Sequence, residues 1–139
     1  MSAAAHFIFY VADQARAARF YAAVLGQAPR LDVPGMTEFD LAGGAVLGLM
    51  PEAGIRRLLG DALPDPAAAR GQPRAELYLL RDDAPACHAR ALAAGALELS
   101  PMQPRAWGHE VAYGLDPDGH VLALARQPGG GEPAPAARR

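Results

Sequence analysis

Several residue types are missing or scarce in this chain of 139 residues. It contains no lysine and no asparagine, and the absence of lysine excludes catalysis through a lysine Schiff base. Ser2, Thr37 and Ser100 carry its only serine and threonine hydroxyls, and no Gly-x-Ser-x-Gly turn occurs. These absences argue against a serine hydrolase.

Cysteine and long apolar runs are scarce as well. Cys87 is the only cysteine, so no disulfide can form within the chain, and we expect a reducing, cytoplasmic location and a packing role for this thiol. No run approaches the roughly 20 apolar residues of a membrane span, and residues 1–6 lack the basic start of a signal peptide. The net charge is −2 with both signs mixed, so we expect neither a membrane nor a nucleic acid as partner.

Apolar residues make up 51% of the chain, enough for a packed core. Alanine, glycine, proline and arginine abound, which is the bias of a GC-rich genome. The length suits one compact domain, which we place at residues 1–127. Residues 128–139 are rich in proline, glycine and alanine, so we expect a disordered tail there.

The first half of the chain predicts the order strand, helix and three strands, over residues 6–50. Residues 6–11 are aromatic and β-branched, as in a strand. Asp13 is a good helix N-cap, apolar residues follow at helical spacing, and Gly26 is a suitable helix end. We expect further strands at residues 29–33, 36–41 and 45–50, with Gly43 and Gly44 in a hairpin turn.

The same pattern restarts at residue 74 and runs to residue 127. A strand is expected at residues 74–80 and a helix at residues 84–94, capped by Asp82 and Asp83. Gly95 lies as far from Asp82 as Gly26 lies from Asp13, which indicates an internal repeat. Three further strands are expected at residues 97–100, 108–115 and 120–125, with a hairpin turn at residues 116–119.

Residues 51–73, between the two halves, are rich in proline, glycine, aspartate and alanine. A short helix is expected at residues 55–59, and the segment is either a surface linker or a functional lid. Neither half is expected to bury its sheet alone. We therefore expect the α+β class, with two βαβββ modules that form one curved mixed sheet.

Three stretches resemble a known family. Residues 6–13 (HFIFYVAD) with residues 19–26 (RFYAAVLG) resemble the opening of a glyoxalase/bleomycin-resistance module, in the vicinal oxygen chelate superfamily. Trp107-Gly108, followed by residues 116–120 (DPDGH), resembles the closing hairpin of the second module. The resemblance implies the fold, in which the curved mixed sheet surrounds a concave cleft. It does not imply one activity, because the family includes metal-dependent lyases, isomerases and dioxygenases as well as metal-free proteins that sequester antibiotics.

The resemblance also implies where metal ligands would stand, one on each of four strands. His6 occupies the first position and Glu76 the third, where a histidine is usual. Gly48 and Ala123 occupy the second and fourth positions, and neither side chain can bind a metal. A catalytic metal site needs about three protein ligands. We therefore expect no metal and no other cofactor; if a metal is bound, His6 and Glu76 should hold it.

The candidate ligand-binding residues are those that strand alternation or the family motif places toward the cleft. We expect Glu76 to lie in an apolar wall, where its charge needs a partner or a ligand. The full candidate set is His6, Ile8, Tyr10, Met50, Glu76, Tyr78, Trp107 and Tyr113.

Two functions remain open from the sequence. The first is a metal-independent small-molecule binding protein, for an antibiotic-like compound or a metabolite, acting as a homodimer. The second is a metal-dependent glyoxalase-like lyase, isomerase or dioxygenase with a rearranged ligand set. The sequence names neither the ligand nor any catalytic residue, and it leaves open whether the cleft forms within one chain or across the dimer.

Overall fold

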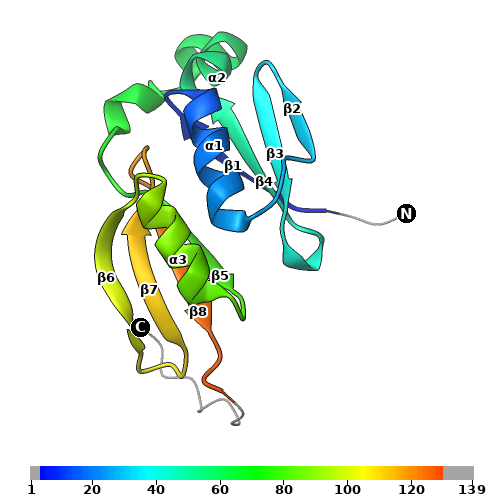
Figure 1. The fold of residues 1–139 in the computed structure, drawn as a ribbon. Coiled ribbons are helices and arrows are strands. Elements are labelled where there is room, and N and C mark those ends of the chain that lie inside the picture. Colours follow the sequence, from blue (N-terminus) through cyan, green and yellow to red (C-terminus); the bar gives the residue numbers. More distant parts are fainter. Residues whose placement is uncertain (1–3, 130–139) are drawn as a thin grey trace. The chain divides into compact units, whose positions relative to one another are not determined.

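The computed structural model describes residues 4–129, which divide into two compact units. Unit 1 takes the chain up to residue 22 and residues 26–71, and unit 2 takes residues 23–25 and the chain from residue 72 onward. Each unit has its own four-stranded sheet with a helix against it (Figure 1). The expected α+β class and the two βαβββ modules are confirmed. Hydrogen bonds join the strands into two sheets, one per module, where the sequence predicted one.

The elements of unit 1 follow the predicted order closely. They are β1 (His6–Val11), α1 (Gln14–Leu25), β2 (Leu31–Val33), β3 (Met36–Asp40) and β4 (Val46–Pro51). The Asp13 side chain caps α1 by accepting a hydrogen bond from the Arg16 backbone, and Gly26 ends the helix in the left-handed conformation at φ 68°. Local capping chemistry therefore explains why these boundaries could be predicted.

The sheet of unit 1 has the strand order β1-β4-β3-β2. β1 runs parallel to β4, and the remaining neighbours are antiparallel. One face carries Val11, Phe39 and Leu47, which are completely buried. The opposite face carries the alternate residues of β1 and β4, including several of the predicted site residues.

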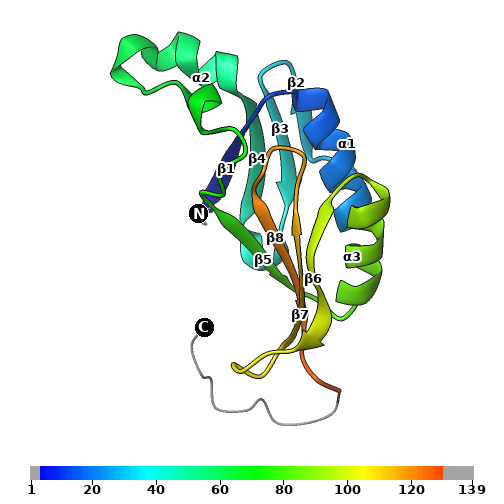
Figure 2. The ribbon, with the colours of Figure 1, turned by 90° about the vertical axis from the view of Figure 1, so that its left-hand side faces the viewer.

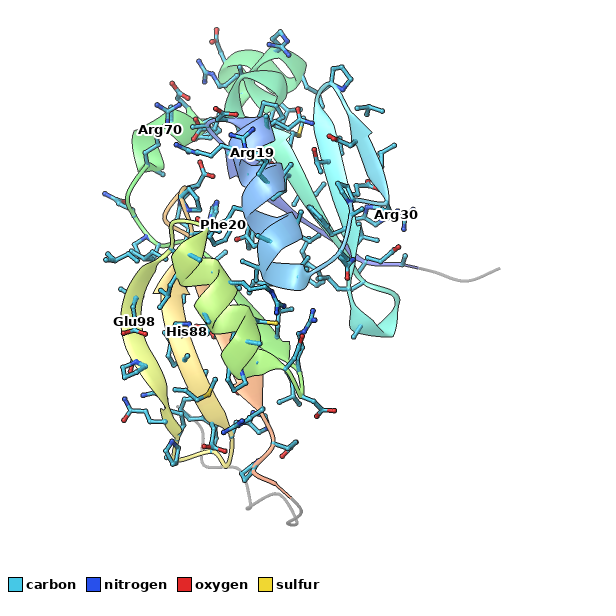
Figure 3. All side chains as sticks on the ribbon, viewed as in Figure 1. Arg19, Phe20, Arg30, Arg70, His88 and Glu98 are labelled. Carbon is cyan, nitrogen blue, oxygen red and sulfur yellow. The ribbon has the colours of Figure 1, made fainter. Side chains whose placement is uncertain are left out.

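Unit 2 repeats the arrangement with β5 (Glu76–Leu80), α3 (Ala84–Ala93), β6 (Leu97–Pro104), β7 (Glu110–Leu115) and β8 (Val121–Arg126). Its strand order is β5-β8-β7-β6, with β5 parallel to β8, and α3 covers one face (Figure 2). β6 is longer than predicted because its pairing with β7 continues, through irregular register, to Pro104. His88 on α3 lies 2.7 Å from Glu98 on β6 through Nε2 and Oε2, which links helix and edge strand (Figure 3).

The two aspartates predicted to cap α3 do not do so through their side chains. Asp83 is the N-cap residue, but its side chain makes no capping hydrogen bond. The Asp83 carboxylate instead accepts two hydrogen bonds from Arg81, from Nε to Oδ1 at 2.7 Å and from Nη2 to Oδ2 at 3.0 Å. These hydrogen bonds lower the pKa of Asp83 to about 2.

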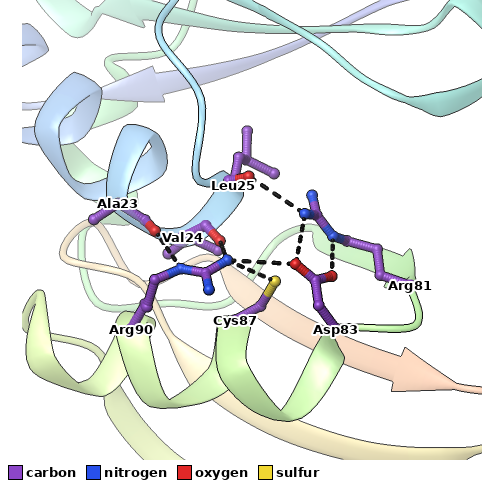
Figure 4. Close-up of polar contacts among 7 residues, drawn as sticks. All are labelled: Ala23, Val24, Leu25, Arg81, Asp83, Cys87 and Arg90. Atoms are coloured by element: carbon purple, nitrogen blue, oxygen red, sulfur yellow. Dashed lines mark hydrogen bonds and ion pairs between the residues drawn. The ribbon is translucent and has the colours of Figure 1, made fainter.

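The same cluster holds the last turn of α1, whose residues 23–25 belong to unit 2 (Figure 4). Arg90 donates to the backbone oxygens of Ala23 and Val24, each at 2.9 Å, and Arg81 donates to that of Leu25 at 3.3 Å. Cationic donors at the carbonyl end of a helix satisfy its unpaired oxygens and oppose its dipole. Cys87 is completely buried beside these arginines, and burial raises the pKa of its thiol. Both findings agree with the packing role expected for Cys87.

The segment that follows β4 is more ordered than a plain linker. Helix α2 spans Glu52–Leu59, three residues earlier than predicted, and short 3-10 turns follow at Gly60–Ala62 and Pro66–Ala69. Glu52 is buried and accepts a hydrogen bond from Arg70 Nε at 3.0 Å, so an ion pair joins the start of the segment to its end. The predicted tail lies largely outside the described residues, and no described helix is long and apolar enough to cross a membrane.

Candidate functional site

The face of the unit 2 sheet opposite α3 carries an aromatic group around Ala123. Tyr78 on β5 and Tyr113 on β7 are both register partners of Ala123 on β8, so the small residue lies between two tyrosines. Trp107 packs on the same cluster with both tyrosines, over the fully buried Val111, Ala123 and Ala125. We call Tyr78, Trp107, Tyr113 and His109 the aromatic face.

A chain of hydrogen bonds crosses the aromatic face. The Trp107 indole Nε1–H donates to the Tyr78 hydroxyl at 3.0 Å. The same hydroxyl lies 2.5 Å from His109 Nδ1, and the two rings are tilted with centroids 5.9 Å apart. Trp107, Tyr78 and His109 are each half-buried. Three polar atoms are therefore held in fixed order at the boundary between core and solvent.

Arg105 supports this arrangement from the loop that joins β6 to β7. Its guanidinium donates to the Ser100 hydroxyl at 2.8 Å and to the Val111 backbone oxygen at 2.8 Å. The Arg105 Cζ atom also lies 5.1 Å from the centre of the Tyr113 ring, within cation–π range. Arg105 therefore fixes the Trp107 loop and places a positive charge beside the aromatic face.

The corresponding face of unit 1 carries the other predicted residues. His6, Ile8 and Tyr10 alternate along β1, and Tyr10 is the register partner of Met50 on β4. Ile8 is 42% exposed, and Tyr10 and Met50 are half-buried. The predicted residues of β1 and β4 thus share one sheet face, as strand alternation requires.

His6 has acidic and basic neighbours on this face. His6 Nδ1 lies 3.5 Å from Glu38 Oε2, while Arg30 Nε lies 3.3 Å from Glu38 Oε1. Arg30 Nη1 also lies 3.1 Å from Asp40 Oδ1. Glu38, on β3, was not a sequence candidate, because only the β3–β4 register brings it beside the β1 histidine.

Glu76 does not lie where its sequence context suggested. We expected a carboxylate within an apolar wall, but Glu76 is exposed. The reason is topological: β5 is an edge strand and Glu76 is its first residue. The argument from burial therefore fails for this residue, and its role in ligand binding stays a prediction.

A depression of about 490 Å³ lies elsewhere in unit 1, between α1 and the turn after β2. The Gln14 side chain at its edge donates hydrogen bonds to the Val33 backbone oxygen and the Thr37 hydroxyl, and accepts one from the Gly35 backbone N–H. None of the predicted site residues lines this depression; its lining is Gln14, Ala15, Ala18, Arg19, Asp32, Val33 and Pro34.

Comparison with known proteins agrees with the two-module architecture. The model of a glyoxalase-like domain matches residues 6–125, which is most of the chain. The chain belongs to the glyoxalase-like domain family.

Solved structures share the fold of this glyoxalase-like chain at low sequence identity. A glyoxalase-related enzyme from Fulvimarina pelagi is 23% identical, with a TM-score of 0.74 over 99% of this chain and 100% of that one. A glyoxalase/bleomycin resistance protein/dioxygenase from Nocardioides is 19% identical, with a TM-score of 0.72 over 99% and 91%. A search of curated proteins gave no significant match. These likenesses establish the fold alone.

The residues of this glyoxalase-like chain do not fit the metal that the fold family implies. A Cβ atom at Gly48 would lie 3.0 Å from Ile8 Cγ1 and 3.2 Å from Met36 Sδ. These two side chains therefore fill the space that a metal-binding side chain at position 48 would need. Ala123 is completely buried under the aromatic face. Among residues 4–129, no group of three or more histidine, cysteine, aspartate or glutamate side chains is placed to hold a metal ion.

The structure brings the predicted residues together in two groups, one per unit. Tyr78, Trp107 and Tyr113 form one group, and His6, Ile8, Tyr10 and Met50 share the sheet face of the other. His109 was missed as a member of the first group. Its place beside the Trp107-Gly108 motif was a usable signal, but the partner that gives it a role is 31 residues away in sequence.

Proposed function

We propose that this protein binds a small molecule without a metal, and that the ligand rests on the aromatic face. The observation that carries the proposal is the packing of Tyr78, Trp107 and Tyr113 against the buried Ala123. The family resemblance places a metal-binding carboxylate at that position, and here a buried alanine under aromatic side chains stands in its place. Aromatic side chains with a few fixed polar groups are the usual lining of small-molecule sites.

The first module supports the same reading independently. Ile8 and Met36 occupy the space that a ligand side chain at Gly48 would need. His6 contacts Glu38, whose carboxylate is shared with Arg30. A metal-dependent lyase, isomerase or dioxygenase would need about three protein ligands, and these positions do not supply them. The proposal includes a cytoplasmic location, which the single cysteine favours, and a homodimer, which the family resemblance favours.

Metal analysis tests the first half of the proposal. Protein purified without chelator should contain far less than one Ni, Zn, Mn or Fe ion per chain, and adding these ions should leave the melting temperature unchanged. About one tightly held ion per chain, released by His6→Ala or Glu76→Ala, would overturn it in favour of a metal-dependent activity.

Ligand titration tests the second half. Trp107 is the only tryptophan, so its indole N–H gives a single, assignable NMR signal that reports on the aromatic face. Titration with 2-naphthamide, a flat neutral probe, should shift this signal saturably. Replacing Tyr113 with Ala should weaken binding, whereas Leu58→Ala, at an exposed residue of α2, should not. Absence of any saturable shift contradicts the proposal.

A further inference from the structure

The hydrogen-bond chain on the aromatic face has a direction set by its chemistry. An indole N–H can only donate, so the Tyr78 oxygen accepts from Trp107. The Tyr78 proton is then directed to His109 Nδ1, 2.5 Å away, because neutral imidazole is a better base than a phenol. Nδ1 is thus the acceptor, and we assign the single proton of neutral His109 to Nε2.

The outward end of the chain is therefore a donor. Among residues 4–129, His109 Nε2 has no hydrogen-bond partner, and it is not one of the buried unpaired atoms. A half-buried ring thus presents an N–H to solvent beside Trp107 and Tyr78. Because Nδ1 is occupied, the imidazole cannot flip to present an acceptor without breaking its bond to Tyr78.

The charges near His109 leave this donor available. Glu110, its sequence neighbour, pairs with Arg126 at 3.3 Å. Arg105 is held over the Tyr113 ring by its hydrogen bonds to Ser100 and to the Val111 backbone oxygen. His109 Nε2–H is therefore a donor of the aromatic face that a ligand can meet.

We infer that His109 is the specificity-determining residue of the aromatic face, where its Nε2–H selects flat ligands that carry a carbonyl or carboxylate oxygen. The inference rests on the proposed function and adds the ligand class to it. Trp107 and Tyr78 are positioning residues for this step, since they act by fixing the tautomer and orientation of His109. A ligand that offers only donors leaves Nε2–H unpaired on binding and is rejected.

The tautomer can be tested without any ligand. A long-range ¹H–¹⁵N NMR spectrum at about pH 7.5, where free histidine is mostly neutral, should show His109 protonated at Nε2. Tyr78→Phe removes the hydroxyl that fixes the ring, so the tautomer preference should weaken in that variant. A wild-type His109 protonated at Nδ1 would overturn the inference while leaving small-molecule binding intact.

Ligand selectivity is tested with three probes that share one ring: 2-naphthoate, 2-naphthamide and 2-naphthylmethylammonium. The two acceptor-bearing probes should bind about tenfold more tightly than the ammonium, as judged by the Trp107 indole signal. His109→Phe should abolish this difference, and His109→Gln, which keeps an amide N–H, should restore part of it. His88→Gln is the matched control. His88 lies on α3 and bonds to Glu98 on β6, away from the aromatic face.

The outcomes separate the two proposals. Equal binding of the three probes by wild type, or selectivity that survives His109→Phe, overturns the role of His109 alone. No binding of any probe overturns the proposed function and this inference together. Preference for naphthoate over naphthamide identifies an acid as the better ligand, and the reverse identifies a neutral carbonyl compound; either supports the inference.

Discussion

At the scale of single residues, Gly48 occupies a position where the family resemblance places a metal ligand. Replacing it with valine should lower the free energy of unfolding by about 1–3 kcal/mol, because Ile8 and Met36 must move to admit the new side chain. Chemical denaturation of Gly48→Val, Ile8→Ala and the double variant would measure this. The double variant should be more stable than the sum of the single losses predicts.

The control for that cycle is Gly54→Ala in α2. A Cβ atom there would meet Met50 Cε at 3.7 Å, an ordinary contact, and alanine favours a helix more than glycine does. This variant should be neutral or slightly stabilising. Additive losses in the Gly48–Ile8 cycle would show that Ile8 does not fill the space at position 48.

At the scale of elements, the Glu52–Arg70 pair stabilises the segment that contains α2. Glu52 is only 6% exposed, so Arg70→Ala leaves a buried carboxylate without this partner. We expect a loss of about 1–3 kcal/mol in the free energy of unfolding. Adding Glu52→Gln should recover part of the loss, because the buried charge is then gone. Arg57→Ala, at an exposed position of the same helix, should change stability by less than about 0.5 kcal/mol.

The start of α3 gives a prediction about acid stability. Hydrogen bonds from Arg81 lower the pKa of Asp83 to about 2 in the folded protein, against about 3.9 in an unfolded chain. The stabilisation is therefore complete above about pH 5 and is lost as the pH falls toward 2. Asp83→Asn should flatten the fall in stability between pH 5 and 2, measured by urea unfolding.

The exposed neighbour Asp82 supplies the comparison for that measurement. Asp82→Asn should keep the wild-type slope, since Arg81 bonds to Asp83. Identical slopes for wild type and Asp83→Asn would contradict a stabilising role for the Arg81 pair. The effect should be modest, because the Asp83 side chain is 46% exposed and water screens the pair.

At the scale of the whole molecule, we predict a homodimer in solution. The edge strand β6 exposes Leu97 and Leu99 to 62% and 50%, and the edge strand β2 exposes Leu31 and Val33. Apolar side chains on sheet edges are commonly covered by association with another chain. Sedimentation at micromolar concentration should give twice the chain mass, and a species near 14.5 kDa would contradict the prediction.

Local sequence patterns specify the repeat and most of its boundaries. Asp13 and Gly26 specify where α1 begins and ends through local hydrogen bonds and a positive φ, which depend on neighbouring residues alone. The turn before β8 is equally local, since the Asp116 carboxylate accepts from the backbone of Asp118 and His120. Alternation along the strands likewise predicted that Tyr78 and Tyr113 lie on the sheet face that carries the candidate site. These features need no knowledge of distant residues.

The contacts of the site residues depend on long-range packing. Sheet order made β5 an edge and exposed Glu76, contrary to its apolar sequence context. Strand register set Ile8 and Met36 in the space at Gly48 and placed Glu38 beside His6. Pairing across 31 residues gave Tyr78 its bond to His109. Strand order, register and side-chain packing are set by the competition of many distant contacts, so no local pattern specifies them.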